Sequence, residues 1–518
     1  MVNYGPSGAC HACREKRKKC DQSRPSCLRC SRARRSCPGY ESTKERQFVN
    51  YIGKEDFQAL HQAHSEALSR VAVPDSLGIL NWSDIERDAR LLFFNDYCIV
   101  SSNRNLSRGY LHGLRAMVYK AGPKSELVQA CTLIALANLG SKLGNSIHRH
   151  RAEGHYSSLL RSFRLSISNQ AVFTTVESLI TATLLGIYEI ITSTGTTLGA
   201  HAAHAQGISA ILVSKFSPFD LLCDGALFRV ANPTPLEDLE VEISEPPSSL
   251  PHSSAIVNKV SKKFSVLCTP LFNQSSSAID FFYASTVSLV RKAKALLDNE
   301  AEATVDQLCQ LKSEAEQLRE AYDTWPATVP LEWIPKSVGL VTPKAEDTLP
   351  QVGYWPTTIL SYYDLYVASL WNNYRKAALL MLSIILRCHY RINGDLSDRI
   401  FEYSILKDIL KQSEGIVSSI PYLLTADLPA FVENAAKRSP PIIPGQPIGG
   451  LLSMHTLFVL ATLPMIEEEL RIYARDCLAW IGAHMGIGQA TVLSKYTKLN
   501  QFQYATEARV IIWTGMLI

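Results

Sequence analysis

The spacing of apolar residues predicts helices along most of the chain. Apolar side chains recur at steps of one, three and four residues, which places them on one face of a helix. Five such series occur, over residues 127–137, 176–191, 208–212, 365–382 and 451–470. Strand-like alternation of apolar and polar residues is scarce. The pattern therefore predicts a large all-α, multi-helix domain over residues 81–518.

Three stretches interrupt the helical pattern and are predicted to be loops. Residues 232–254 are rich in proline, serine and acidic residues, and residues 326–356 contain six prolines. Residues 439–450 combine four prolines with three glycines. Such compositions cannot continue a helix, and we expect the first stretch to be a disordered loop. Within it, residues 238–243 alternate acidic with apolar side chains, as do activation segments that bind coactivators, although a solvated loop or an edge strand gives the same pattern.

Residues 41–80 are polar and are predicted to be a linker. Steps of three and four residues connect an apolar series with one histidine, namely Phe57, Leu60, His64, Ala67 and Val71. A series of this kind can form a short dimerisation helix in a homodimer, but it covers barely two heptads. An amphipathic helix that packs on its own chain is the favoured alternative.

The charges are distributed unevenly between the N-terminal segment and the rest of the chain. Residues 1–46 contain twelve Lys and Arg residues against four Asp and Glu residues, whereas the remaining residues contain forty against forty-four. The first segment is therefore strongly basic and the rest is slightly acidic. We expect affinity for nucleic acid in the N-terminal segment and no appreciable affinity elsewhere.

Cysteine usage and hydropathy predict a soluble protein of a reducing compartment. Seven cysteines are dispersed without metal-ligand spacing, namely Cys98, Cys131, Cys223, Cys268, Cys309, Cys388 and Cys477. A dispersed, odd set is typical of buried, reduced thiols. The N-terminus lacks the charged and apolar regions of a secretion signal. The longest apolar stretch, residues 451–465, contains His455 and Pro464, so no membrane span is expected.

Six cysteines near the N-terminus form one spacing pattern repeated twice. The first half contains Cys10, Cys13 and Cys20, and the second half contains Cys27, Cys30 and Cys37. Zinc takes four tetrahedral ligands, and a C-x2-C step lets two thiolates reach one ion. Two zinc ions require eight ligand positions, so two of the six sulfurs must bridge both ions. Equivalent positions are the natural bridges, but spacing alone does not choose among the pairs Cys10 and Cys27, Cys13 and Cys30, or Cys20 and Cys37.

Basic residues are concentrated inside this cysteine cluster. Five lie between Cys13 and Cys20, namely Arg14, Lys16, Arg17, Lys18 and Lys19. Cations help to keep metal-bound thiolates deprotonated, but five in six positions exceed that requirement. Clustered Lys and Arg residues on a small rigid module indicate nucleic-acid binding. The alternatives are a nuclear import signal, a storage cluster or a zinc module that contacts proteins.

The N-terminal segment resembles the fungal six-cysteine binuclear zinc cluster family of transcription factors. The resemblance rests on Cys13-Arg14-x-Lys16-Arg17-x-Lys19-Cys20-Asp21 and on Pro25 ahead of Cys27. It implies two zinc ions bridged by Cys10 and Cys27. One ion would take Cys10, Cys13, Cys20 and Cys27, and the other would take Cys10, Cys27, Cys30 and Cys37. The module is expected to occupy residues 1–40.

The same resemblance implies a helix after Cys13 in the major groove of double-stranded DNA. Lys16 and Arg17 would contact the bases of a CGG-type triplet, in agreement with the preference of Lys and Arg for guanine. Arg14 and Lys19 would hold phosphates, and Lys18 is the remaining expected DNA-binding residue. Relatives usually have Lys at position 17 and an apolar residue at position 18, where this chain has Arg17 and Lys18.

The helical part resembles, more loosely, the fungal-specific transcription factor domain. The segments concerned are residues 91–94, 184–189, 201–207 and 371–375. Both resemblances together imply a nuclear, sequence-specific DNA-binding regulator of RNA polymerase II transcription, such as the regulator of a pathway or a biosynthetic gene cluster. The alternative is a helical ligand-binding or scaffold protein whose zinc module contacts other proteins.

Signals of catalysis are weak. His201 and His204, like His61 and His64, are three residues apart and could share a metal, but no third ligand or H-E-x-x-H motif accompanies them. The glycines at positions 486 and 488 lack the context of a dinucleotide fold, and no G-x-S-x-G motif occurs. The sequence therefore predicts that the protein is not an enzyme.

Overall fold

The computed structural model divides the chain into two compact units, Met1–Leu60 and His61–Ile518. It describes residues 12, 13, 16, 20, 21, 27–33, 37, 66, 67, 82–103, 106–144, 146–173, 175–194, 200–213, 286, 289–298, 303–343, 350–394, 398–497, 511, 512, 514 and 515. The predicted loop at 232–254, its acidic segment 238–243 and most of the series from 57 to 71 lie outside these residues. Of that series, Ala67 is described and is buried in the main core.

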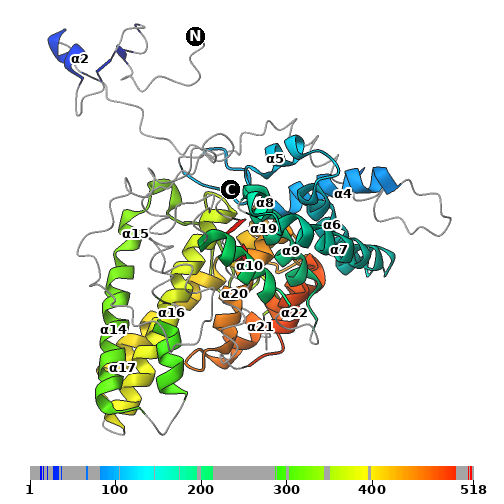
Figure 1. The fold of residues 1–518 in the computed structure, drawn as a ribbon. Coiled ribbons are helices and arrows are strands. Elements are labelled where there is room, and N and C mark those ends of the chain that lie inside the picture. Colours follow the sequence, from blue (N-terminus) through cyan, green and yellow to red (C-terminus); the bar gives the residue numbers. More distant parts are fainter. Residues whose placement is uncertain are drawn as a thin grey trace. The chain divides into compact units, whose positions relative to one another are not determined.

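The second unit is helical, as predicted (Figure 1). Its first helices are α4 (Trp82–Tyr97), α5 (Leu114–Ala121), α6 (Glu126–Lys142), α7 (Ser146–Ile167), α8 (Gln170–Phe173), α9 (Val176–Thr192) and α10 (Ala202–Val213). Helix α6 packs against α4, α5, α7 and α9 and is buried along almost its whole length. Its apolar residues surround the helix instead of forming one stripe, which is the pattern of a central helix.

Side-chain caps fix where the central helices begin. The hydroxyl of Ser125 accepts a hydrogen bond from the Val128 amide at the start of α6, and Thr175 does the same for Ser178 at the start of α9. Each cap satisfies an amide that has no partner within its helix. The predicted helix at 176–191 is therefore confirmed with nearly the expected bounds.

Helices α14 (Val305–Asp323), α16 (Leu365–Asn393) and α17 (Arg399–Val417) lie side by side at the lower left of Figure 1. We call these three helices the arm. Helix α16 packs against both α14 and α17. A salt bridge between Arg319 of α14 and Asp408 of α17 joins the other two helices. Shorter helical segments follow α14 and α17, namely α15 (Trp325–Thr328), η3 (Leu331–Trp333), α18 (Ile420–Leu424) and α19 (Leu428–Asn434).

The prediction that residues 326–356 form only a loop is wrong in part. Strand β1 (Lys336–Leu340) pairs antiparallel with β2 (Thr358–Ser361), with a register shift between Ser337 and Gly339. The prolines flank the strands and so remove no hydrogen bond from them. Ile359 of β2 is buried in a small separate core with Tyr354 and Phe431. Strands this short carry too little alternation to be recognised in the sequence.

Two predictions about the C-terminal helices also need correction. The loop predicted to reach Gly450 ends earlier, because α20 (Pro447–Thr462) begins at Pro447. Proline suits the first helical position, where its missing amide hydrogen costs nothing. The helix predicted over 451–470 is two helices, because the chain leaves α20 at Leu463 and re-enters a helix in α21 (Glu468–Met485). Pro464 lies in this break. Helix α22 (Gly488–Leu493) follows.

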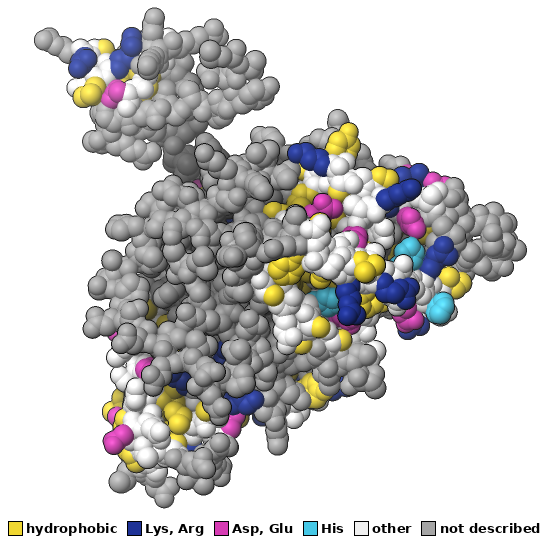
Figure 2. Space-filling view, viewed as in Figure 1, with side chains coloured by type: hydrophobic (Ala, Val, Ile, Leu, Met, Phe, Trp, Pro, Cys, Tyr) yellow, Lys and Arg dark blue, Asp and Glu magenta, His cyan; other side chains and the backbone are white. Residues whose placement is uncertain are grey.

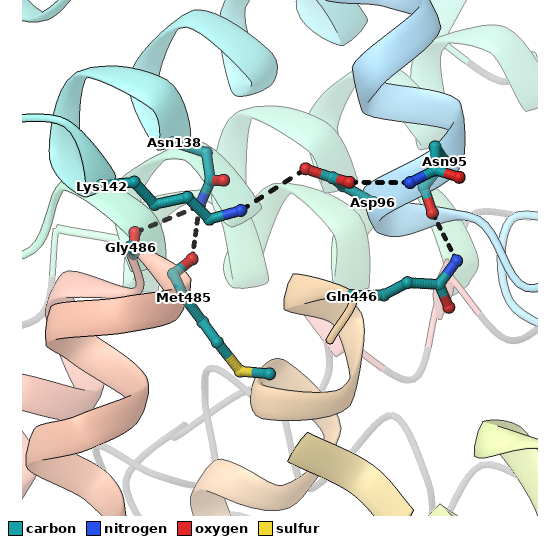
Figure 3. A network of polar contacts seen from close by, with 7 residues as sticks. All are labelled: Asn95, Asp96, Asn138, Lys142, Gln446, Met485 and Gly486. Atoms are coloured by element: carbon teal, nitrogen blue, oxygen red, sulfur yellow. Dashed lines mark hydrogen bonds and ion pairs between the residues drawn. The ribbon is translucent and has the colours of Figure 1, made fainter. Parts of the chain in front are cut away.

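A polar network connects α4 and α6 with the end of α21 (Figure 3). The Asn138 amide of α6 donates to the Met485 carbonyl at 2.7 Å, at the point where α21 ends in left-handed Gly486. These terminal carbonyls have no partner within their own helix, so Asn138 supplies one. Nearby, Lys142 lies 3.6 Å from the carboxylate of Asp96, which also accepts from Asn95.

The scattered cysteines that the structure describes are mostly buried, as predicted, whereas Cys223 and Cys268 lie outside the described residues. Cys98, Cys131, Cys388 and Cys477 are buried free thiols, but Cys309 on α14 is exposed, contrary to expectation. None of the described helices combines the length and the apolar character that crossing a bilayer requires.

Lys376 is a charged residue on a core-facing side of α16. It is 3% exposed, and its ammonium donates to Asn373 at 3.1 Å. Burial lowers the pKa of Lys376 to about 7, because the interior disfavours the charged form. Lys376 in turn helps to lower the pKa of buried His455 on α20. Lys376 and His455 are therefore basic groups in the core that lose their protons more readily than they would in water.

Lys376 should make the stability of the protein rise with pH. Because its pKa is about 7 when folded and near 10.4 when unfolded, the unfolded chain binds more protons between these values. The cost of burying the charge is complete below pH ~7 and disappears above pH ~10. The difference in unfolding free energy between wild type and Lys376→Met, measured by denaturant titration, should change by up to ~1.4 kcal/mol per pH unit across this range. Lys120→Met, at an exposed position, is the control. If the difference in unfolding free energy from wild type stayed constant across this pH range for Lys376→Met, as it should for Lys120→Met, the lowered pKa of Lys376 would be wrong.

Candidate metal centre

The described cysteines of the first unit form two groups that share one residue. The sulfurs of Cys13, Cys20 and Cys27 lie within 4.8 Å of one another, and so do those of Cys27, Cys30 and Cys37. Cys13, Cys27 and Cys30 are fully buried, whereas Cys20 and Cys37 are half-buried. Cys10 lies outside the described residues. The two halves of the sequence repeat are thus brought together at Cys27.

The spacing of these sulfurs fits tetrahedral zinc. The sulfurs of Cys13 and Cys27 are 3.8 Å apart. Two sulfurs bound to one tetrahedral ion at about 2.3 Å each are expected about 3.8 Å apart. Among the residues that the structure describes, these two cysteine groups are the sets of three or more ligand atoms close enough to hold a metal.

A short helix, α2 (Leu28–Arg32), organises the second half of the cluster. Cys27 is its N-cap, and the Cys27 sulfur accepts a hydrogen bond from the Cys30 amide at 3.3 Å. The carboxylate of Asp21 accepts hydrogen bonds from the first two amides of the helix, those of Leu28 at 3.1 Å and Arg29 at 3.4 Å. Three amides at the start of the helix are therefore satisfied by side chains, two of them by a residue of the first half.

Sequence reasoning did not assign these roles to Asp21 and Cys27. Asp21 appeared only as part of a matching motif, and it lies seven positions before the first amide that it caps. The usual capping signal places the side chain directly before the helix, so a distant cap leaves no recognisable spacing. Cys27 was expected as a ligand but not as a helix cap.

Of the predicted DNA-binding residues, the structure describes Lys16, which is exposed. Arg14, Arg17, Lys18 and Lys19 lie outside the described residues. Helix α2 adds two further exposed basic side chains, Arg29 and Arg32. In Figure 2, Lys and Arg side chains lie at the surface of the described part of this unit. The metal cluster is thus accompanied by exposed positive charge.

Of the histidine pair of the second unit, His201 is buried and His204 is half-buried. His201 is 1% exposed, and the ring of His204 is 3.0 Å from the Tyr156 hydroxyl, which also donates to Glu189 at 2.5 Å. Burial, with His201 nearby, lowers the pKa of His204 to about 4. The contacts of His204 with Tyr156 are those of a packed side chain. His61 and His64 lie outside the described residues.

An open pocket lies between the ends of α6, α7 and α9. It has a volume of about 610 Å3, and its lining includes Glu126, Ser166, Asn169 and Glu177. The Ser166 hydroxyl donates to Glu126 at 2.9 Å. Burial and the neighbouring Glu126 raise the pKa of Glu177. Hydroxyl and carboxyl groups therefore line this pocket beside the apolar side chains of Phe163 and Leu165.

Comparison with known proteins identifies the first unit. Residues 8–47, which contain all six clustered cysteines, match the family described as the fungal Zn(2)-Cys(6) binuclear cluster domain. Over 447 residues the chain is 32% identical to "Transcription factor dbaG" of Emericella nidulans, and the match covers 86% of this chain and 98% of that relative. No solved structure matches.

The similarity to the relative extends far beyond the cysteine cluster. An alignment of 447 of the 518 residues must include most of the helical unit, because the first unit has only 60 residues. Zinc binding through the cysteine cluster and DNA binding follow from the family, and the grouped sulfurs and exposed basic residues described above agree with both. The chain therefore belongs to the fungal Zn(2)-Cys(6) binuclear cluster family of DNA-binding transcription factors.

Proposed function

We propose that the protein reads CGG-type triplets in double-stranded DNA and regulates RNA polymerase II transcription in the nucleus. A pathway or a biosynthetic gene cluster is the proposed target, and coactivators are the proposed protein partners. The observation that carries the proposal is the meeting of two cysteine groups at Cys27, beside exposed basic residues of both sequence halves. We further propose residues 1–40 as the DNA-binding domain, 41–80 as a linker and 81–518 as a regulatory domain without catalytic activity.

The proposed metal centre holds two zinc ions on Cys10, Cys13, Cys20, Cys27, Cys30 and Cys37. Cys27 belongs to both described sulfur groups, which supports it as one bridge. Its counterpart in the repeat is Cys10, so the first ion would take Cys10 with Cys13, Cys20 and Cys27. The second would take Cys10 with Cys27, Cys30 and Cys37. Four sulfurs close each coordination sphere, which is typical of structural zinc.

The purified full-length chain should contain two zinc ions, and removing them should affect the first unit alone. A module this small has little apolar core, so its folding depends on its metals. Chelation should abolish DNA binding while the helical circular dichroism changes little. Cys30→Ser should lower the zinc content measured by elemental analysis, whereas Cys309→Ser, a substitution of an exposed thiol, should not. Loss of most of the helical signal on chelation would contradict two independent units.

Base reading is proposed to rest on Lys16 and Arg17. Side chains of this type donate to O6 and N7 of guanine, which distinguishes guanine from other bases in the major groove. Arg14, Lys18 and Lys19 are proposed as the remaining DNA-binding residues, with Arg14 and Lys19 against phosphates. Phosphate contacts fix the position of a protein on the duplex but carry no sequence information.

Arg17→Ala and Lys19→Ala should therefore have different effects. Arg17→Ala should cost about 1–3 kcal/mol on CGG-containing duplexes and should reduce the preference over scrambled duplexes. Lys19→Ala should weaken binding to all duplexes alike and should flatten the salt dependence. Gel-shift titrations on both duplexes at several salt concentrations measure the two effects. If both variants lose affinity equally on every duplex, base reading by this segment is wrong.

Asp21 is proposed as a positioning residue for the second zinc site. Its carboxylate holds the first two amides of α2, and α2 carries Cys30 together with Arg29 and Arg32. A ligand placed on a capped helix needs less ordering when the metal binds. Asp21 thus ties the first sequence half to the ligand-bearing helix of the second.

Replacement of Asp21 by alanine should loosen the cluster without removing a ligand. The lost cap should cost about 1 kcal/mol, and zinc should transfer faster to a competing chelator. Asp21→Asn is the matched control, because asparagine also caps helices well but carries no charge. If capping is the role of Asp21, the Asp21→Asn variant should transfer zinc to the chelator almost as slowly as the wild type. Equal zinc release from both variants would indicate that charge, and not capping, matters.

A further inference from the structure

Arg375 of α16 is a buried guanidinium in the arm. The residue is 7% exposed, and Trp371 and Asn372 lie beside it because residues three and four positions apart share one side of a helix. Its Nη1 atom donates to the Tyr362 hydroxyl at 2.8 Å and to the Asn372 side-chain oxygen at 3.0 Å. No carboxylate among the described residues forms an ion pair with Arg375. Arginine stays charged in proteins, so these bonds hold a positive charge without neutralising it.

Neighbouring side chains hold the guanidinium in one orientation. The Cζ atom of Arg375 lies 5.5 Å from the centre of the Trp371 ring and 5.9 Å from that of Tyr362, distances at which aromatic rings attract cations. The Asn372 amide in turn donates to the Ser419 hydroxyl at 2.8 Å, which fixes the side chain that Arg375 contacts. A group held in this way loses little further freedom when it binds a ligand.

The other edge of the guanidinium is open. The N–H groups on Nε and Nη2 of Arg375 have no hydrogen-bond partner among the described residues, and neither atom is sealed from solvent. These two nitrogens form the edge that donates two parallel hydrogen bonds to the paired oxygens of a carboxylate or a phosphate. Arg375 thus combines one edge that the protein holds with a free edge of the geometry that binds oxyanions.

Gly415 of α17 leaves room for this guanidinium. A Cβ atom at position 415 would lie 2.5 Å from Nε of Arg375, and 3.0 and 3.1 Å from Cδ and Cζ, the two atoms bonded to Nε. These short and nearly equal distances place it over the face of the guanidinium and not beyond its edge. The end of α17, two residues later at Val417, contributes about half a negative charge to the surroundings. The described residues therefore offset the charge of Arg375 only in part.

We propose that Arg375 binds the oxyanion group of a small molecule, either a carboxylate or a phosphate. Nε and Nη2 would donate to two of its oxygens, while Nη1 stays bonded to Tyr362 and Asn372. The bound group would supply negative charge that the described surroundings of Arg375 provide only in part. Because so little of Arg375 is exposed, a small group suits this opening better than the broad surface of a protein or a duplex.

Oxyanion binding at Arg375 would give a chemical role to a sequence feature that DNA reading does not use. Residues 371–375 are among the segments through which the chain resembles the fungal-specific transcription factor domain, and none of them belongs to the metal centre. Arg375 lies on α16, Gly415 lies on α17, and Ser419 directly precedes α18. A ligand that binds only the folded form would make the stability of the helical unit depend on the ligand concentration.

Thermal unfolding of the full-length, zinc-loaded chain tests the proposal. The probes are acetate and inorganic phosphate, each compared with chloride at equal ionic strength. At least one of the two oxyanions should raise the Tm of the wild type until the shift saturates. Such anions also stabilise proteins without binding at a site, but that effect grows steadily with concentration and is the same in a variant. The saturating part of the shift therefore measures binding.

Arg375→Lys and Gly415→Ala should both weaken the binding. Lysine keeps the charge but lacks the paired N–H groups, so the concentration that gives half of the saturating shift should rise by about tenfold or more. Alanine at position 415 would press on Nε and displace the guanidinium, which should also weaken the binding. The matched controls are Arg161→Lys at an exposed position of α7 and Gly154→Ala, whose Cβ would meet nothing within 4 Å, and both should bind like the wild type.

Circular dichroism checks that each variant keeps its helices, and Arg375→Lys decides alone if Gly415→Ala disturbs them. A saturating shift that both variants weaken supports the proposal, and the anion that acts at the lower concentration identifies the group as carboxylate or phosphate. The absence of a saturating shift with both anions in the wild type overturns it. A wild-type shift that persists unchanged in Arg375→Lys, or in a folded Gly415→Ala, overturns it as well.

Discussion

Metal coordination by closely spaced thiolates is the constraint on which the DNA-binding unit depends. The unit has few apolar residues, and Cys13, Cys27 and Cys30 form most of its described interior. Where larger domains bury aliphatic side chains, this unit brings sulfur atoms together. The sulfur distance of 3.8 Å between Cys13 and Cys27 suits ligands of one ion and is too long for a disulfide. Ligand geometry thus determines the fold of a segment that hydrophobic burial could not stabilise.

The helical unit depends on a different principle. Helices α6, α9 and α20 are buried on almost all sides, so neighbouring helices must cover each of them completely. Burial on this scale leaves helix termini away from water, and these termini require partners. Asn138 supplies one for the end of α21, and Asp364 supplies another by accepting from the Val367 amide at the start of α16. The helical unit therefore depends both on close packing of its helices and on hydrogen-bond partners for their buried ends.

The sequence predicted the helical class, the helix at 176–191 and the grouping of the cysteines, because each depends on local spacing. It did not predict features that depend on tertiary contacts. Asp21 caps a helix seven positions away, and Lys376 is buried although it is a charged residue outside the apolar series of α16. The start of α20 was missed because proline at Pro447 was interpreted as a loop residue instead of a first helical residue. The break at Pro464 was missed for the opposite reason, since the apolar pattern continues across it.

Helix α20 also contains a glycine whose role becomes clear only from its neighbour. A Cβ atom at Gly449 would lie 1.9 Å from the backbone carbonyl oxygen of Leu423 in α18, so no larger residue fits without moving one of the two helices. At Gly154 on α7, by contrast, the same atom would meet nothing within 4 Å. Evolutionary drift should accordingly be free at position 154 and blocked at position 449. A comparison of related sequences would then find an invariant glycine at position 449 and varied residues at position 154.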